Sequence, residues 1–456
     1  MNITTRGVIF FTVILLTLKT PSQAASDSIV VSASVKHNIQ RVIQLQDKGQ
    51  EQLALSAARQ ALKEVEAMAG KRRADLVVCM SLLAWLEQNQ GGIAEAEALY
   101  KRALVLNEKL LPADHLAVAE SLAALGGFYY SQGYSEAGVN DLDLVIKAEP
   151  FLKRALEIKE KKLGVDHIDL VAVLHTLGCI GKFRDQYEKT VIYYGRELKI
   201  KEQALGSGHL EVAMIASHLG EAHAVLEQYE QARPLFLRSL KVKEEKLGRE
   251  HADLSYDFSY LILIYFKKGE LAIAEKMGMR MLTINAEPGD DIGELCFNLG
   301  NVGKLYQAQG EYQKAEVFFI RSVILQEKVL GKKHPDLLDA MGELLTLYHM
   351  QGKHALAEPY LAKVLAIQEK ELGGDAVEVG LSLNNLAWVY AAQQKYEQAE
   401  PLYKRSLAIR EKALGFNTLE VAQTLMNMAE LYYALGRKKE ALHYKQRSEI
   451  IQAILQ

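Results

Sequence analysis

The chain has 456 residues, 49% of them hydrophobic, and a formal net charge of −3. This length suits either two or three compact domains or one extended array of repeats. Binding a nucleic acid needs a basic surface, and the near balance of charge gives no reason to expect such a partner.

The first 24 residues have the pattern of a secretory signal peptide. Arg6 gives a basic start, residues 7–18 form an apolar run, and residues 22–24 supply the small side chains that a signal peptidase reads. The run is shorter than the roughly 20 apolar residues of a membrane-spanning helix, and no later segment could span a bilayer. We therefore expect an exported protein, periplasmic or secreted, that begins at Ala25 and keeps no integral membrane segment. An uncleaved anchor is the alternative.

A Leu-Gly pair recurs along the chain at a spacing of 42 residues, with one interval of 83. Its glycines are Gly164, Gly206, Gly248, Gly331, Gly373 and Gly415. Gly289 lies in the long interval, and Gly70 and Pro112 continue the period upstream. A fixed period of this length predicts a solenoid of stacked repeats.

Each period contains two amphipathic helix patterns, such as residues 381–392 and 397–413. The glycine closes the second pattern, where we expect it to cap the helix in the left-handed conformation. The position 26 residues after each glycine anchor is alanine in most copies, and Thr190 departs from the pattern. These alanines are Ala96, Ala232, Ala274, Ala315, Ala357, Ala399 and Ala441. Ala54 and Ala137 take the same place in two aberrant copies. Such small residues predict close contact between helices.

Prolines follow several of these alanines at a distance of two residues, at Pro234, Pro359 and Pro401, and Pro150 takes the same place. We expect them in the first turn of the second helix, where a missing N–H costs nothing. Before Pro150, the eleven residues 138–148 interrupt the third copy. An unbroken helix would keep its apolar face in phase across them, but Gly138, Asn140 and Pro150 favour an insertion that bulges from the solenoid.

Fourteen residues after the glycine anchor stands a small residue, such as Gly303 or Ala387, and three residues later an aromatic one, such as Tyr306 or Tyr390. Together with the alanine of the register, this pattern resembles the tetratricopeptide repeat. The wording "LNNLAWVY…YEQAEPLYKRSLAIREKALG" resembles the 42-residue subtype found in kinesin light chains and many bacterial proteins, although the heptads that bind the kinesin heavy chain are absent. The resemblance covers roughly residues 35–456. It implies an all-α, right-handed superhelical solenoid of about ten helix pairs, forming a single domain over residues 25–456.

The sequence gives no support for a catalytic or metal site, and we expect no enzyme activity and no cofactor. Cys79, Cys179 and Cys296 have no CxxC spacing and fall in different copies, so we expect buried free thiols. Five histidines follow the glycine anchor by three residues, and stacking would separate them too widely to bind one metal. They are His115, His167, His209, His251 and His334.

The first helices of such arrays line the concave side, which is the expected binding surface. By phase, we place eight candidate partner-binding residues there: Trp85, Asn301, Lys304, Asn384, Asn385, Trp388, Asn427 and Tyr433. The same face is expected to hold His175, Ser217, Tyr256, Glu343, His349, Gln423 and Glu430. Tryptophan is common at binding hot spots and amides can bond a peptide backbone. The alternative is that these residues pack between neighbouring first helices.

These features favour a non-catalytic exported scaffold that binds a peptide or protein partner in its concave groove. The alternative is a non-catalytic subunit or chaperone of an envelope assembly or secretion complex. A pulldown distinguishes the two by several sub-stoichiometric partners or one stable complex.

Overall fold

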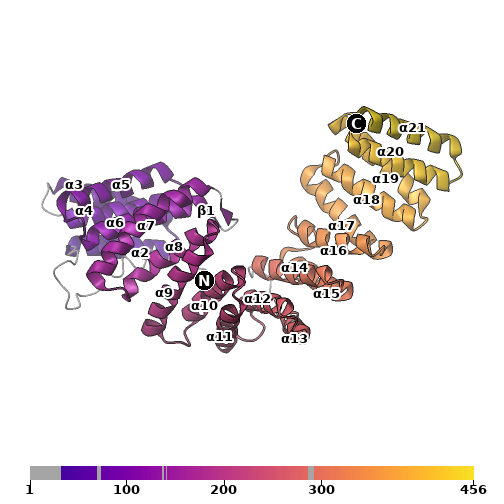
Figure 1. The fold of residues 1–456 in the computed structure, drawn as a ribbon. Helices are drawn as coiled ribbons and strands as arrows, with labels where there is room; N and C mark the ends of the chain where they lie inside the picture. The colour runs from indigo at the N-terminus through magenta and orange to yellow at the C-terminus, as the bar shows by residue number, and fades with distance from the viewer. Residues whose placement is uncertain (1–31, 69–72, 136–137, 140, 286–291, 456) are drawn as a thin grey trace. The chain divides into compact units, whose positions relative to one another are not determined.

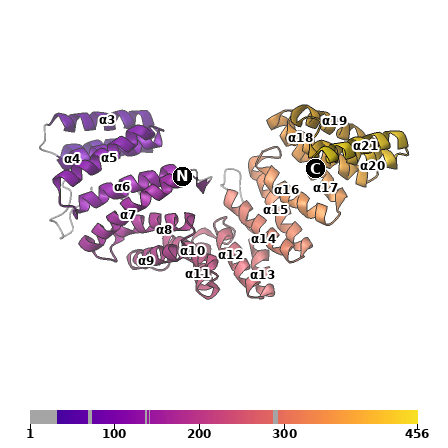
Figure 2. The same ribbon diagram turned by 45° about the horizontal axis from the view of Figure 1, so that its top comes forward.

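The computed structural model describes residues 32–68, 73–135, 138–139, 141–285 and 292–455. The expected signal segment at residues 1–24 and the positions Gly70, Ala137 and Gly289 lie outside these ranges. The described chain is built from helices that follow one another in pairs (Figures 1 and 2). It divides into two compact units, residues 1–239 and 240–456.

Unit 1 contains the first five helix pairs, except that the end of the tenth helix, α11, belongs to unit 2. They are α2 (Ala33–Asp47) with α3 (Glu51–Ala67), α4 (Arg73–Asn89) with α5 (Ile93–Leu110), α6 (Leu116–Gly133) with α7 (Leu142–Leu163), α8 (Val171–Phe183) with α9 (Tyr187–Leu205), and α10 (Leu210–Val225) with α11 (Tyr229–Leu247). A short 3₁₀ helix, Ile168–Leu170, precedes α8.

Unit 2 contains five further pairs in the same alternation. They are α12 (Leu254–Lys267) with α13 (Leu271–Met281), α14 (Gly293–Ala308) with α15 (Tyr312–Leu330), α16 (Leu337–Met350) with α17 (His354–Leu372), α18 (Val377–Ala392) with α19 (Tyr396–Leu414), and α20 (Leu419–Ala434) with α21 (Lys438–Leu455). The prediction of an all-α solenoid of about ten helix pairs is confirmed. None of the helices in the described ranges is both long and apolar enough to cross a membrane.

The alanine register forms the contact between the two helices of each pair. Every described alanine of the register is buried, and Thr190 is buried in the same place. Thr190 Oγ1 donates to the carbonyl oxygen of Gly178 at 3.2 Å, so its hydroxyl is satisfied without solvent. Opposite the register, a Cβ on Gly178 would lie 2.2 Å from the Tyr194 ring. Small residues on the first helix therefore make room for rings on the second.

The glycines that close the second helices have a positive φ, as predicted, but a different ψ. Gly373 has φ 85° and ψ 156°, and Gly164 has φ 92° and ψ 158°. These values lie in an extended region that is essentially restricted to glycine, and not in the left-handed helical region that we expected. The Gly373 N–H still donates to the Glu369 carbonyl, and the chain then leaves the helix extended.

The insertion in the third pair is largely helical, so the expectation of a bulge is wrong for most of it. Residues 142–148 extend α7 at its start, and Pro150 lies inside this 22-residue helix. Ala148, buried, takes the core place that we had assigned to Ala137. The apolar face continues from Val145 through Ala148 to Leu152, and its burial offsets the hydrogen bond lost at Pro150. Before α7, strands β1 (Tyr134–Ser135) and β2 (Gly138–Val139) form a short antiparallel pair.

The other three prolines also lie deeper in their helices than we expected. Pro359 and Pro401 are each the sixth residue of their helix, in α17 and α19, and Pro234 has the same place in α11. Since the first turn ends earlier, each proline removes one hydrogen bond within the helix. Packing of the buried alanine two residues before each of them stabilises the helix in spite of this loss.

Candidate binding surface on the first helices

On α14 and α18, two first helices of unit 2, the residues 8, 12 and 15 positions after the glycine anchor lie on one helix face and form a partly exposed stripe. On α14 these residues are Phe297, Asn301 and Lys304, and on α18 they are Leu381, Asn385 and Trp388. We call these six residues the first-helix stripe. Phe297 is 67% exposed and Leu381 is 50% exposed, so each of the two helices presents a large apolar side chain on this face.

Four of the predicted binding residues belong to this stripe and are accessible to different degrees. Asn385 and Lys304 are exposed, and Asn301 and Trp388 are half-buried. Lys304 Nζ lies 2.7 Å from Glu343 Oε1 on α16, so a surface ion pair joins two successive first helices. Tyr433, on α20, is 71% exposed and is the most accessible of the predicted aromatic residues.

The other two predicted asparagines do not present free amides. Asn384 and Asn427 are only 6% and 9% exposed. Asn427 Nδ2 donates to Asn384 Oδ1 at 3.1 Å, and Gln423 Nε2 donates to Asn427 Oδ1 at 3.1 Å. Asn385 and Asn427 are one period of 42 residues apart, but Asn384 is the neighbour that Asn427 contacts. These two amides join α18 to α20, as in the packing alternative.

The two tryptophans are each partly buried. The Trp388 ring is edge-on to His354 with ring centroids 4.7 Å apart, and its centroid lies 5.4 Å from that of His349. Trp85 packs against the core of the first two pairs. Part of each indole therefore contributes to packing, and the remaining surface can contact a ligand.

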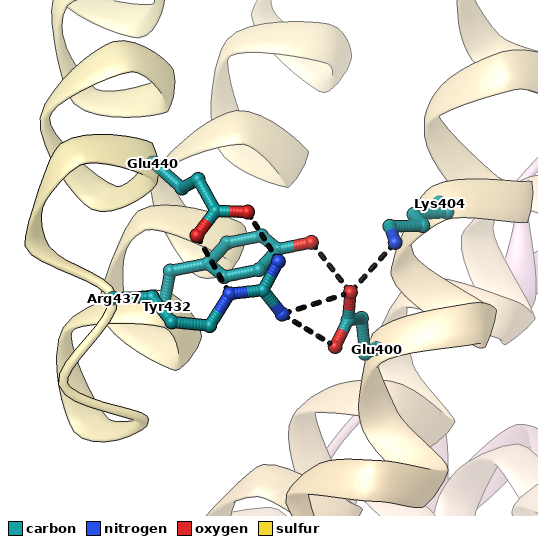
Figure 3. A network of polar contacts seen from close by, with 5 residues as sticks. All are labelled: Glu400, Lys404, Tyr432, Arg437 and Glu440. Carbon is teal, nitrogen blue, oxygen red and sulfur yellow. Dashed lines mark hydrogen bonds and ion pairs between the residues drawn. The ribbon is translucent and has the colours of Figure 1, made fainter.

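A network of polar contacts between neighbouring copies was missed by the sequence analysis. Figure 3 shows Glu400 of α19 between Lys404, Tyr432 and Arg437. Tyr432 Oη donates to Glu400 Oε1 at 2.8 Å, and Lys404 Nζ lies 2.6 Å from the same oxygen. The hydrogen bonds from Lys404 and Tyr432 lower the pKa of the Glu400 carboxyl. Burial and the bond to Glu400 raise the pKa of Tyr432 to about 12.

An ion-pair ladder repeats along the second helices. In its rungs a glutamate four residues before the glycine anchor pairs with an arginine or lysine of the next copy, 36 residues later along the chain in most rungs. The rungs are Glu66–Arg102, Glu108–Arg154, Glu160–Arg196, Glu202–Arg238, Glu244–Arg280, Glu327–Lys363, Glu369–Arg405 and Glu411–Arg447. A search of the sequence for acidic and basic residues that recur 36 residues apart could have found this ladder.

The five loop histidines make the same backbone contact just before the first helices. In each, Nδ1 accepts a hydrogen bond from the backbone N–H two residues later, at 3.1 to 3.3 Å. Three of them are N-caps, His115 of α6, His167 of the 3₁₀ helix before α8 and His209 of α10, where the bond satisfies a donor that the first turn leaves without a partner. Within the described ranges, no group of three histidine, cysteine or acidic side chains is placed to hold a metal.

Comparison with known families identifies the repeat. Two family models described as Tetratricopeptide repeat match this chain, one at residues 294–370, 346–412 and 378–449, the other at 76–117 and 212–253. Together these segments amount to more than half of the chain. No curated protein matches the sequence.

Solved structures share the helical repeat at low similarity. BtubC (BKLC) from P. vanneervenii is 22% identical, with 52% of this chain and 94% of that chain covered and a TM-score of 0.39. A putative kinesin light chain from Podosopora anserina, with nearly identical TPR-like repeats, is 26% identical, with 45% and 99% covered and a TM-score of 0.36. The apo form of RapI is 15% identical, with 92% and 98% covered and a TM-score of 0.46.

Proposed function

Because this chain belongs to the tetratricopeptide repeat family, we propose that it is a non-catalytic scaffold that binds a peptide or protein partner on the exposed face of its first helices. The first-helix stripe carries this proposal. Phe297 and Leu381 expose large apolar side chains, and each is followed one helical turn later by an amide, Asn301 or Asn385. A peptide in contact with the stripe would bury apolar surface and find hydrogen-bond partners for its backbone.

The partner chemistry follows from the mixture of side chains on the stripe. Apolar anchors beside amides suit an extended peptide with one or more large apolar residues, since amides can both donate to and accept from a peptide backbone. The half-buried Trp388 adds a rigid ring near Asn385, and such rings are common at binding hot spots. The tyrosine at position 433 is a further candidate contact on α20.

We also propose that the protein is exported and begins at Ala25 after cleavage. The support is the basic start, apolar run and small-residue site of the first 24 residues. Intact-mass measurement of the protein recovered from the envelope and medium tests this: the expected mass lacks residues 1–24. A mass that still includes Met1 contradicts it.

Binding to the stripe is tested with partners captured by crosslinking in the native envelope and then measured with purified protein. Leu381→Ala and Trp388→Ala are expected to weaken binding by about 1–2 kcal/mol each, as hot-spot truncations do. Leu372→Ala is the matched control, since Leu372 is an exposed leucine at the end of α17, outside the stripe. Circular dichroism checks that helical content is unchanged.

Wild-type affinity in both stripe variants would exclude the stripe as the binding surface. One permanent partner at fixed stoichiometry would instead identify a subunit of an assembly. Several sub-stoichiometric partners that compete for the stripe would support the scaffold.

A further inference from the structure

A cluster of ionisable side chains lies where α8, α9 and α10 pack together in unit 1. Cys179 and His175 are one helical turn apart on α8, so they share a helix face. Cys179 Sγ lies 3.2 Å from the hydroxyl of Tyr194 on α9. His175 Nδ1 donates to Glu197 Oε2 at 3.1 Å, and the His175 ring centroid lies 6.1 Å from that of His218 on α10.

Glu197 fixes the charge of this cluster. It is completely buried, and its second oxygen lies 3.1 Å from Lys201 Nζ, one helical turn later on α9. A buried carboxylate between two cationic groups stays ionised. Burial opposes this charge, but His175 and Lys201 together hold the pKa of the Glu197 carboxyl below its ordinary value.

His175 connects this carboxylate to the thiol. Burial disfavours its charged form, but Cys179 and Glu197 outweigh burial and raise the pKa of the imidazole well above its ordinary value. The imidazole lies one helical turn before Cys179 on the same face of α8. Burial alone would raise the pKa of Cys179, yet the charge and hydrogen bond of His175, with the hydroxyls of Tyr194 and Tyr130, lower it.

The other two cysteines provide an internal contrast. The residue four positions before Cys79 is the buried carboxylate Asp75, where Cys179 has a histidine. Burial and the charge of Asp75 raise the pKa of Cys79 to about 12. Burial raises the pKa of Cys296 to about 11, and the residue four positions before it is the apolar Ile292. All three cysteines are free, but Cys179 is half-buried where we expected it to be buried.

We propose that Cys179 is a reactive thiol, placed beside the His175–Glu197 pair and the Tyr194 hydroxyl, and that it is the site where this protein forms mixed disulfides with small disulfide molecules. The thiolate attacks one sulfur of the small disulfide and forms a new S–S bond. The original S–S bond breaks, and its electron pair leaves with the second sulfur, which takes a proton from solvent. The chain contains three cysteines, and no other lies on α6 to α10, so an external thiol is needed for reversal.

The surroundings suit this reaction. The His175 side chain is 28% exposed and Cys179 is half-buried, so a small molecule can reach the cluster. The groups next to the thiol are Tyr130 from α6, His175 from α8 and Tyr194 from α9. Around them lie Glu197 and Lys201 from α9 and His218 from α10. Tyr194 can donate its hydroxyl hydrogen to the thiolate.

The test uses the full purified chain with glutathione disulfide as the probe and mass mapping of each cysteine at pH 6.0 and pH 9.0. Free N-acetylcysteine, an accessible thiol with an ordinary pKa, is the reference. For each thiol, we divide the modification rate at pH 6.0 by the rate at pH 9.0. We expect this ratio to be at least about 10-fold larger for Cys179 than for N-acetylcysteine, because each unit of pKa changes the thiolate fraction tenfold. Cys79 and Cys296 should remain unmodified in the folded protein.

Variants test the role of the imidazole. His175→Asn should lower the Cys179 rate at pH 6.0 by about 10-fold or more and change it little at pH 9.0, where the thiol ionises without help. His209→Asn is the control, since an asparagine there can still cap α10. In wild-type protein, the thiolate absorbance at 240 nm that Cys179→Ser removes should appear at a lower pH than the thiolate absorbance of free N-acetylcysteine.

Three outcomes overturn the proposal. The first is a Cys179 rate that depends on pH as the reference does. The second is a rate in His175→Asn that falls equally at both pH values, which would indicate lost access and not lost ionisation. The third is an absence of modification at Cys179 in the folded wild-type protein at either pH.

Discussion

The fourth and ninth helix pairs place different chemistry at the same point of the repeat. Fifteen residues after the glycine anchor stands Cys179 in α8 and Trp388 in α18. Near Cys179, the buried Glu197 forms ion pairs with His175 and Lys201. Near Trp388, α18 and α20 are joined by the uncharged amides of Asn384 and Asn427. The same backbone therefore tolerates a buried ionic cluster or a neutral amide pair.

This difference shows which positions determine the fold and which can vary. Both pairs keep the small buried residue of the register, Thr190 or Ala399, and a tyrosine packed four residues later, Tyr194 or Tyr403. These residues set the distance between the helices. The first-helix positions that face away from this contact are not held by it, so they can carry charges in one copy and rings or amides in another.

The largest effect is expected from removing the buried carboxylate of the fourth pair. Glu197→Ala leaves His175 and Lys201 without their shared partner in a buried site, and we expect a loss of about 3 kcal/mol in the free energy of unfolding. Urea unfolding followed by circular dichroism measures it. Glu188→Ala, an exposed glutamate on the same helix, should change stability by less than about 0.5 kcal/mol. Similar losses in the two variants would show that the cluster is not ionic.

The register of the ninth pair is the next most sensitive feature. Ala399 is fully buried between α18 and α19, so Ala399→Phe should destabilise the protein by about 1–3 kcal/mol through overpacking. Lys395→Ala removes a half-exposed ion pair with Glu358 and should cost less than about 1 kcal/mol. Thermal unfolding of both variants measures the difference. Equal shifts would place the contact between the helices elsewhere.

The amide pair of the ninth and tenth copies should matter less than the ionic cluster. Asn384→Ala leaves Asn427 Nδ2 without its acceptor, for which we expect a loss of about 1 kcal/mol by urea unfolding. Asn385→Ala, next to it on α18 but exposed, is the control and should be close to wild type. A loss as large as that of Glu197→Ala would contradict the distinction between the two regions.

The smallest effect is expected in the pH dependence of the network around Glu400. Lys404 and Tyr432 lower the pKa of this carboxyl in the folded protein. The folded state therefore gains stability above the ordinary glutamate pKa of about 4.3. This stability is lost as pH falls from that value through the lowered pKa. Glu400→Gln should reduce the slope of stability against pH in this acidic window, measured by urea unfolding at several pH values. An unchanged slope would show that the network contributes nothing.

Features that repeat within one copy could be predicted from the sequence. The glycine anchors, the alanine register and the number of helix pairs follow from a period that packing within each pair imposes. The conformation after Gly373 differed because a positive φ alone does not determine ψ. The helical start of α7 was not predicted. Gly138 and Pro150 favour a turn locally, but burial of the apolar face that includes Val145 stabilises the helix more strongly.

Contacts between copies were harder to predict. Equivalent positions are 42 residues apart, but Asn384 and Asn427, which bond each other, are separated by 43 because successive first helices are offset. This single residue decides whether Asn427 faces Asn384 or Asn385, and so whether an amide is buried or exposed. The cluster around Cys179 and His175 depends in the same way on side chains from α6, α9 and α10, which no local pattern brings together.

The ion-pair ladder has a consequence for how the array can change in length over evolution. Each rung joins an acidic residue of one copy to a basic residue of the next, and the same chemistry recurs at the same place. Recombination that removed residues 374–415, one full period, would bring Glu369 opposite Arg447 in place of Arg405, and the new junction would again be an ion pair. Copies can therefore be lost or gained by unequal crossing-over without leaving an unmatched charge at the seam.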